Sequence, residues 1–395
     1  MSTRTIIFAG GGSGGHIFPN LAIFEKLREL RPDSVAHFLL SKREIDADIA
    51  SKNDLSYAAL PASPLRMRPR DLLDFYRNYK ASEAQVTALI KGIQPRAMVA
   101  TGGFVSAPAV KAARKLGLPV ALVNLDAVPG KANKFTAKDA TEIFSVYQTG
   151  DLPRARQIGL PLRASAKAQL PQALAREQLH LDPDMKTLLV FAGSQGGRTL
   201  NEMMIEFASR TNTRNLLGQK NIPTTQAHHN AEPRNWNRIE NDQNEASSGW
   251  QVLHLTGPDD RDRVAEAYAQ AGIPARVESF CNQMHLCWAA ATLGICRAGA
   301  GSVAEVWTNH VPTIFLPYPF HKDNHQFANV EPLVATGGAM VLKDQADAIA
   351  NASQLVGAIK SLMTNAAQRE RMRNCLADTQ PDDGAATVAQ WILTV

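Results

Sequence analysis

The sequence Thr5-Ile6-Ile7-Phe8-Ala9-Gly10-Gly11-Gly12-Ser13-Gly14-Gly15-His16 joins a short apolar run to a glycine-rich loop. A second unit of this kind opens the other half of the chain, at Thr187-Leu188-Leu189-Val190-Phe191-Ala192-Gly193-Ser194-Gln195-Gly196-Gly197-Arg198. A buried strand that runs through glycines into a helix presents bare backbone N–H groups, at the positive helix end, to an anion. Two such units predict two nucleotide-fold domains that face each other across a cleft and bind a phosphorylated ligand.

Length and composition favour a two-domain globular protein. The chain has 395 residues, which fits two domains of about 150–200 residues each. Hydrophobic residues make up 45% and charged residues 20%, an ordinary balance for such proteins. The net charge of +5 suits phosphorylated ligands or an anionic membrane surface. No lysine-rich tail or basic-aromatic array is present, so no nucleic-acid partner is expected.

The apolar segments and the cysteines indicate the compartment in which the protein is expected. No stretch approaches the roughly 18 uninterrupted apolar residues of a transmembrane helix. The apolar run 6–9 is a strand rather than a signal peptide, because glycines follow it at once. The cysteines, Cys281, Cys287, Cys296 and Cys375, show no CxxC spacing. They are expected to be reduced, buried and inert, which favours a cytoplasmic protein.

Strands and helices alternate along the chain, which predicts parallel α/β sheets. A helix is expected from Ile17 to Leu30, with Pro19 tolerated in its first turn. The predicted strands are residues 36–40, 97–100, 120–123, 143–146, 187–192, 251–255, 275–279, 292–296 and 312–316. Active loops should lie at the carboxyl ends of these strands.

Glycine and proline at residues 157–163 mark a crossover between the two domains. We therefore expect an N-terminal domain of residues 1–162 and a C-terminal domain of residues 163–395. The polar, aperiodic stretch 211–249 is interpreted as an insertion in the second domain. A last helix is expected over residues 384–395, after a Pro-Asp-Asp turn. This helix can pack back on the first domain.

The glycine pattern 10-x-12-x-x-15 also matches a dinucleotide fingerprint, which alone is a weak signal. The second predicted strand is followed by Ser41-Lys42-Arg43 rather than by an acid that would hold a ribose. Lys42 and Arg43 would suit a 2′-phosphate, so an NADP enzyme stays open. One cofactor fingerprint does not account for the second glycine loop, however, and no GxxxxGK[ST] loop occurs.

His16 stands at a predicted helix N-terminus, where a histidine is usually a cap or a packed ring. The helix end disfavours the imidazolium, which would leave a neutral ring able to accept a proton. Residues 101–108 follow another strand and form either a tight turn or a second anion cradle. Ser302 and Glu305 fit a capping box, and the rival role for Glu305 is to bind ribose hydroxyls. The dense polar loop 317–326 is a further candidate.

Two acidic motifs and one basic segment can each be explained by a structural role as well as by a functional one. Asp46-Ala47-Asp48 is expected in a helix and Asp182-Pro183-Asp184 in a turn, so no essential metal is predicted. His228-His229 is expected to be solvated. The segment between Leu65 and Lys80 mixes apolar and basic residues. It is interpreted either as core packing with a basic edge or as a patch that docks on anionic lipid.

Together these motifs resemble the MurG family, the UDP-N-acetylglucosamine transferase that completes lipid II in peptidoglycan synthesis. The resemblance runs end to end, over residues 10–19, 101–108, 127–134, 159–163, 193–198, 297–305 and 323–329. It implies a GT-B fold, with two Rossmann-like doubly wound parallel-sheet domains facing across a cleft. It also implies a peripheral enzyme on the cytoplasmic face of the inner membrane that needs no cofactor and contributes to cell shape and division.

The resemblance also implies the site residues. His16 would be the catalytic base. The donor UDP-GlcNAc would be bound by Ser13, Gly14, Gly15, Asp126, Arg163, Ser194, Gln195, Gly196, Cys281, Ala300, Gly301, Ser302, Val303, Ala304, Glu305, His325 and Gln326. The undecaprenyl-linked acceptor, lipid I, would be bound by Gly14, Gly15, Thr101, Gly102, Gly103 and Asn133. The membrane would meet the segment between Leu65 and Lys80, and other cell-wall enzymes are further expected partners.

Residues 123–126 depart from the family pattern. The family usually reads His-Glu-Gln-Asn where this chain has Val123-Asn124-Leu125-Asp126, so Asp126 replaces an asparagine expected near the donor sugar. The departure keeps two alternatives open, a GT-B transferase acting on another lipid and a UDP-sugar-binding homologue with weak or lost activity. A nucleotide-sugar epimerase and a Rossmann dehydrogenase are the remaining alternatives.

Overall fold

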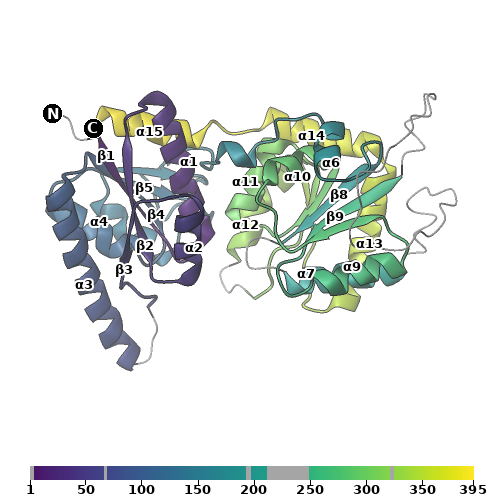
Figure 1. Ribbon diagram of the computed structural model, residues 1–395, viewed down its shortest axis with the longest axis horizontal. Coiled ribbons are helices and arrows are strands. Elements are labelled where there is room, and N and C mark those ends of the chain that lie inside the picture. The colour runs from purple at the N-terminus through teal and green to yellow at the C-terminus, as the bar shows by residue number, and fades with distance from the viewer. Residues whose placement is uncertain (1–3, 66–68, 193–196, 211–248, 321–323) are drawn as a thin grey trace.

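The computed structural model describes residues 4–65, 69–192, 197–210, 249–320 and 324–395. They form two α/β units side by side, each built on a wholly parallel sheet (Figure 1). The first sheet has seven strands in the order β3-β2-β1-β4-β5-β6-β7, and the second has six in the order β10-β9-β8-β11-β12-β13. Both orders are the doubly wound arrangement of nucleotide-binding folds, as predicted.

The first unit contains the early strands and the helices that connect them. Its elements are β1 (Thr5–Gly10), α1 (Gly14–Leu30), β2 (Val35–Ser41), α2 (Glu44–Lys52), β3 (Tyr57–Leu60), α3 (Pro69–Ile93), β4 (Ala97–Gly102), α4 (Ser106–Lys115), β5 (Val120–Asn124), α5 (Lys131–Thr136), β6 (Glu142–Ser145) and β7 (Arg156–Gln157).

The second unit begins after the crossover. Its elements are α6 (Gln172–Gln178), β8 (Lys186–Phe191), α7 (Arg198–Arg210), β9 (Trp250–Leu255), α9 (Arg261–Gln270), β10 (Ala275–Glu278), α10 (Met284–Ala290), β11 (Leu293–Cys296), α11 (Ala300–Asn309), β12 (Thr313–Phe315), α12 (His325–Ala335), β13 (Ala339–Val341), α13 (Ala348–Thr364) and α14 (Ala366–Asp378). The last helix, α15 (Gly384–Thr394), returns to the first unit (Figure 1).

Helix α15 completes the core of the first unit. Its apolar residues Ala385, Val388, Ala389 and Ile392 lie in one cluster with side chains of β1, β2 and α1. The guanidinium of Arg96 donates to the last carbonyls of the helix, at Ile392 and Leu393, over 3.0 and 2.9 Å. A Cβ at Gly159 would clash with the carbonyl of Asp382, and a Cβ at Gly384 would clash with the carbonyl of Gly159. The two passages of the chain between the units therefore lie against each other.

The predicted strands are confirmed, and three short strands were missed. The edge strand β3 is partly exposed, β7 has only two residues, both exposed, and β13 has only three residues, one buried and two partly buried. All three are short strands at the edges of the sheets, and none has the fully buried pattern of the central strands. Helix α1 begins at Gly14, earlier than predicted, because the last two glycines of the loop are helical. The proposed insertion lies outside the described residues, except for Gly249.

The strand orders place the predicted loops together. The order changes direction between β1 and β4 in the first sheet, and between β8 and β11 in the second. Ligands of such sheets bind in the crevice at this switch point, beyond the carboxyl ends of the strands. The loops after β1 and β4 meet there, and the backbone register shifts at Gly10 opposite Gly102. No helix in the described part of the chain has the length and apolar content to span a membrane.

Candidate active site

Asp46 holds the first glycine loop in place. Its carboxylate accepts hydrogen bonds from the N–H of Gly12, at 2.8 and 3.0 Å, and from both the N–H and the hydroxyl of Ser41. Gly12 has a φ of +88°, which glycine adopts at little cost, and a Cβ there would lie 2.8 Å from the Phe104 ring. Asp46 lies in α2 as predicted, fully buried, and it braces the loop.

His16 lies between the two glycine loops of the first unit. Its Nδ1 is 3.2 Å from the hydroxyl of Ser13, and the residue is partly buried. A Cβ at Gly102 or Gly103 would come within 3.3 Å of the imidazole, and Gly103 has a φ of +76°. Only glycines allow the loop after β4 to approach the ring this closely. Gly15, the preceding residue, is exposed, which leaves the start of α1 open.

Burial lowers the pKa of His16 below its usual value. The charges of Asp126 and Asp46 and a backbone hydrogen bond at Gly11 act in the opposite direction. Burial therefore favours the neutral ring that the sequence predicts, whereas the helix end was the cause expected from the sequence. A neutral imidazole can accept a proton, as a general base must.

Thr101 and Asn133 flank the histidine. The Thr101 hydroxyl donates to the carbonyl of His16 over 2.7 Å, so this buried side chain supports the start of α1. The amide of Asn133 donates to Asn124 Oδ1 over 3.0 Å. Its own Oδ1 is buried beside Gly102 and has no hydrogen-bond partner among the described residues. This oxygen is therefore a buried acceptor without a protein donor among the described residues.

Asp126 and Asn329 connect the two units. The Asn329 side chain donates to Oδ1 of Asp126 over 3.0 Å and accepts from the N–H of Ala127 over 2.8 Å. It also contacts the Ala298 carbonyl, while its own carbonyl accepts from the Tyr147 hydroxyl over 3.0 Å. Asn329 is fully buried on α12. One carboxylate oxygen of Asp126 is thus directed into the contact between the units.

The N-terminus of α11 has open space around its glycines. A Cβ at Gly299 or Gly301 would meet no atom within 4 Å. Ala300 and Ala304 pack against the core of the first unit, so the helix start faces that unit. Arg163, just beyond the crossover, lies with its guanidinium 4.4 Å from the centre of the Phe18 ring of α1. Backbone N–H groups at a helix start and a guanidinium are groups that bind anions in proteins.

The capping box predicted for Ser302 and Glu305 is wrong. Helix α11 begins at Ala300, its N-cap is Gly299, and no side chain caps it. Glu305 instead accepts a hydrogen bond from the indole N–H of Trp288 over 2.7 Å. Burial raises the pKa of Glu305 to about 7, against the opposing effects of Trp288 and Arg163. No sequence motif pointed to Trp288, which lies on the neighbouring helix α10.

The remaining predicted donor residues are distributed around α10 and α12. Gln326 Oε1 accepts from the N–H of Tyr318, and His325 is the first residue of α12. Cys281 is partly exposed after β10. The expectation that all four cysteines are buried is wrong, because Cys281 and Cys375 are partly exposed, although all four are free thiols. Ser194, Gln195 and Gly196 lie outside the described residues.

A buried ion pair supports the second switch point. Arg297 follows β11 and donates to Asp344 over 2.8 Å and to the carbonyl of Leu316 over 2.7 Å. Both side chains are almost completely buried. A charge buried in this way needs its partner, so the pair fixes the loop that leads into α11. Asp344 was not found from the sequence, because it lies in a loop without a recognisable motif.

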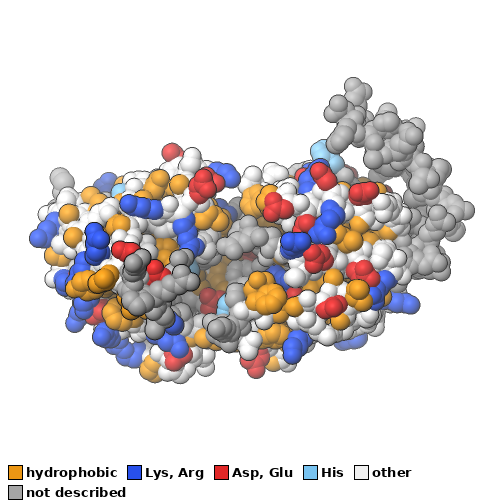
Figure 2. All heavy atoms as spheres, turned by 90° about the horizontal axis from the view of Figure 1, so that it is seen from below, with side chains coloured by type: hydrophobic (Ala, Val, Ile, Leu, Met, Phe, Trp, Pro, Cys, Tyr) orange, Lys and Arg blue, Asp and Glu red, His pale blue; other side chains and the backbone are white. Residues whose placement is uncertain are grey.

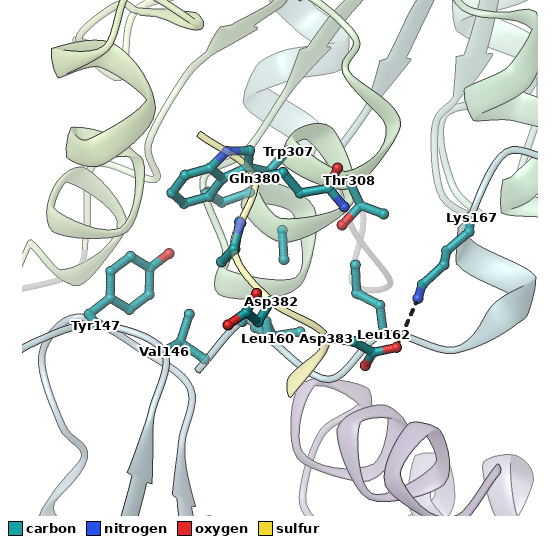
Figure 3. Close-up of a pocket in the computed structure, with 14 residues that line it drawn as sticks. Val146, Tyr147, Leu160, Leu162, Lys167, Trp307, Thr308, Gln380, Asp382 and Asp383 are labelled. Atoms are coloured by element: carbon teal, nitrogen blue, oxygen red, sulfur yellow. Dashed lines mark ion pairs between the residues drawn. The ribbon is translucent and has the colours of Figure 1, made fainter. Parts of the chain in front are cut away.

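A small cavity of about 70 Å³ lies beside the crossovers (Figure 3). Tyr147 and Leu160 of the first unit, Trp307 of α11 and the returning segment at Asp382 line it. Lys167 and Asp383 pair at its edge over 3.5 Å. Of the predicted ligand-binding residues, only Val303 and Ala304 line this cavity. Within the described ranges, no three His, Cys, Asp or Glu side chains are arranged to hold a metal ion.

Known proteins provide an independent comparison. Residues 6–145 match the glycosyltransferase family 28 N-terminal domain, and residues 187–388 match the glycosyltransferase family 28 C-terminal domain. A UDP-N-acetylglucosamine–N-acetylmuramyl-(pentapeptide) pyrophosphoryl-undecaprenol N-acetylglucosamine transferase from Nocardioides sp. is 30% identical over 392 residues, 98% of this chain and 97% of the relative. The Streptomyces coelicolor protein of the same name is 30% identical over 345 residues, 86% of this chain and 84% of the relative. The crystal structure of MurG from Acinetobacter baumannii has a TM-score of 0.70 at 20% identity and covers 99% of both chains.

The chain belongs to the MurG family. It is a glycosyltransferase with two Rossmann-like domains, as the sequence predicted. A putative UDP-N-acetylglucosamine 2-epimerase from Listeria monocytogenes has the same fold, with a TM-score of 0.62 at 12% identity over 99% of this chain and 95% of that one. The fold alone therefore does not separate a MurG-type transferase from an epimerase, whereas the sequence relatives do.

Proposed function

We propose that this MurG-family protein transfers GlcNAc from UDP-GlcNAc to the C4 hydroxyl of MurNAc in undecaprenyl-pyrophosphoryl-MurNAc-pentapeptide. The reaction converts lipid I to lipid II in peptidoglycan synthesis. The observation that carries the proposal is the position of His16, which lies between two glycine loops at the switch point of the first sheet and whose pKa burial lowers. The open start of α11 faces the same domain and is suited to the phosphates of a nucleotide donor.

The reaction is a single displacement with inversion. The acceptor C4 oxygen forms a bond to the anomeric carbon while the bond from that carbon to the phosphate oxygen of UDP breaks, through an oxocarbenium-like state. His16 takes the hydroxyl proton. Its Nδ1 is engaged by the Ser13 hydroxyl, so the proposal assigns this proton to Nε2. Arg163 and the N–H groups of α11 stabilise the charge that develops on departing UDP.

Asp126 has a place in this scheme despite the family pattern. A carboxylate beside a diphosphate would be repelled, but the hydrogen bond from Asn329 holds one of its oxygens in the contact between the units. Its charge favours the imidazolium that His16 becomes after proton transfer. The substitution also supports a second candidate, transfer to another lipid acceptor, because Asp126 lies where the acceptor and donor sugars would meet.

We further propose that the enzyme acts at the cytoplasmic face of the membrane, where its lipid acceptor resides. Leu65, Leu72, Leu73 and Tyr76 are exposed near the start of α3, with Lys80 above the Tyr76 ring at 5.8 Å. In Figure 2, basic and hydrophobic side chains are interspersed over the first unit, with some acidic side chains among them. Such a surface suits an anionic leaflet. Contact with other cell-wall enzymes, and a part in cell shape and division, would follow from this location.

The test is transfer of labelled GlcNAc from UDP-GlcNAc to a lipid I analogue. A reaction without acceptor and a reaction with an undecaprenyl-linked lipid lacking MurNAc serve as controls. Product that depends on the lipid I analogue supports the proposal. Release of UDP in the acceptor-free reaction would indicate an epimerase, and transfer to the second lipid alone would indicate a different acceptor.

A further inference from the structure

Two thiols meet beside the proposed donor site. The sulfurs of Cys281, which follows β10, and Cys287, on α10, are 3.2 Å apart. A disulfide has an S–S length of about 2.05 Å, so the sulfurs need to approach by only about 1 Å. Both cysteines are free thiols in the structure. The resemblance assigns Cys281 to the donor, but it gives no role to Cys287, and the mechanism above uses neither thiol.

The two sulfurs have different surroundings. Cys281 is partly exposed, whereas Cys287 is fully buried in the core of the second unit. The Cys287 thiol donates to the Cys281 sulfur, and the N–H of Gln283 donates to the same sulfur over 3.3 Å. These bonds and the charge of Arg276 lower the pKa of Cys281, while the same contact raises the pKa of Cys287. Cys281 therefore has the exposure and thiolate character of a reactive cysteine.

We propose that Cys281 and Cys287 form a thiol–disulfide site that hydroperoxides oxidise. In the first step the Cys281 thiolate attacks a peroxide oxygen, the O–O bond breaks, and Cys281 becomes a sulfenic acid as the peroxide leaves as hydroxide or alkoxide. In the second step the Cys287 thiol displaces the sulfenic hydroxyl, forms the S–S bond and releases water. The dithiol is oxidised by two electrons and the peroxide is reduced by two.

The disulfide would alter the donor site. It would tie the segment 281–283 to α10 and weaken the acceptor of the Gln283 N–H, because a disulfide sulfur cannot carry a thiolate charge. Trp288, the residue after Cys287, donates to Glu305 over 2.7 Å, so strain at Cys287 reaches the carboxylate assigned to the ribose. This effect rests on the proposed function, because it assumes that the nucleotide binds here. We expect the oxidised protein to bind UDP about tenfold more weakly or worse.

The disulfide is tested on the full chain without any ligand. The protein is treated with hydrogen peroxide, its remaining thiols are alkylated under denaturing conditions, and its peptides are mapped by mass spectrometry. We expect a peptide cross-linked through Cys281 and Cys287 that dithiothreitol separates. Cys375→Ser, which removes the other partly exposed thiol, should give the same cross-link. Cys287→Ala should instead leave a sulfenic acid at Cys281 that dimedone traps. Alkylation of both Cys281 and Cys287 after peroxide treatment of the wild type would overturn the proposal.

The effect on the donor site is tested by titrating UDP into the reduced, oxidised and re-reduced protein. Weaker binding after oxidation, restored by dithiothreitol, supports the assigned effect. Equal affinity of the reduced and cross-linked forms would overturn control of the donor site. Failure of the reduced protein to bind UDP would count against the proposed function, while the cross-link map would still decide whether the thiol pair is oxidised.

Discussion

The side-chain amide of Asn329 in the C-terminal unit donates to the carboxylate of Asp126 in the N-terminal unit, over 3.0 Å. The same carboxylate contributes most among the charges that raise the pKa of His16. One residue that departs from the family pattern therefore joins the two units and acts on the proposed base.

Asp126→Asn should move the pH dependence of transfer. The variant keeps an oxygen that can accept from Asn329 but removes the charge that favours protonated His16. The pKa of His16 should fall, so the acidic limb of the kcat profile should move to lower pH, since a general base works when it is neutral. Asp382→Asn, at the exposed second crossover, is the matched control. An acidic limb that stays in place, or moves to higher pH, would contradict the coupling.

Glu305→Gln should change how stability depends on pH. Burial raises the pKa of Glu305 from 4.5 to about 7 in the folded protein, so the folded state binds a proton that the unfolded state has already released. Folding stability attributable to this group falls as pH rises from about 4.5 to about 7 and then stays level.

The side-chain amide introduced by that substitution would still accept from Trp288 but would not ionise. At pH 8 the free energy of unfolding of the ligand-free variant should exceed that of the wild type by on the order of 1 to 3 kcal/mol. At pH 4.5 the two free energies of unfolding should differ little. Urea unfolding at both pH values measures this, with Glu370→Gln on the surface as control. Parallel stability curves for the variant and the wild type would show that Glu305 titrates normally.

Gly103→Ala should damage both the fold and the site. Gly103 has a φ of +76°, and a Cβ there would lie 2.7 Å from the carbonyl of Gly11 and 3.3 Å from His16. Gly117 has a φ of +69° but open space around its Cβ position. Gly117→Ala should therefore cost only about 1 kcal/mol of backbone strain and leave kcat unchanged. Gly103→Ala should lose more stability and most of its kcat. Equal behaviour of the two variants would refute a tight approach of the loop to His16.

Leu73→Glu should weaken membrane attachment without harming the fold. Leu73 is 69% exposed on α3, so the free protein loses no core contact. Ile349→Glu, 61% exposed on α13 of the other unit, is the matched control. Co-sedimentation with vesicles containing anionic phospholipid should fall for Leu73→Glu only. Equal binding of both variants would place the membrane contact elsewhere.

The sequence predicted both sheets and the loops at their switch points, because buried parallel strands are continuous apolar runs that end in glycines. It did not predict the pairing of Asp126 with Asn329. In the sequence, Asp126 stands out only as a departure from the family pattern, and Asn329 only as part of a motif. The two residues lie 203 positions apart. A contact between domains depends on how the two units pack, which no local pattern encodes.

Glu305 shows how a local pattern can mislead. Its spacing from Ser302 satisfies the capping-box rule, but the N-cap is Gly299, three residues before Ser302, and the carboxylate turns to Trp288. Asp46 shows the reverse case, an acidic motif that resembles a metal ligand but braces a glycine loop. In both cases the partner comes from another element, so only the tertiary structure reveals what the side chain does.

The central claim, that His16 is the base of a transferase acting on lipid I, is tested most directly by comparing the wild type with His16→Ala. The measurement is the rate of labelled GlcNAc transfer to a lipid I analogue, together with the affinity for UDP. We predict acceptor-dependent transfer by the wild type, a loss of roughly 10²- to 10⁴-fold in kcat for the variant, and unchanged UDP affinity. A variant that turns over as fast as the wild type would contradict the account.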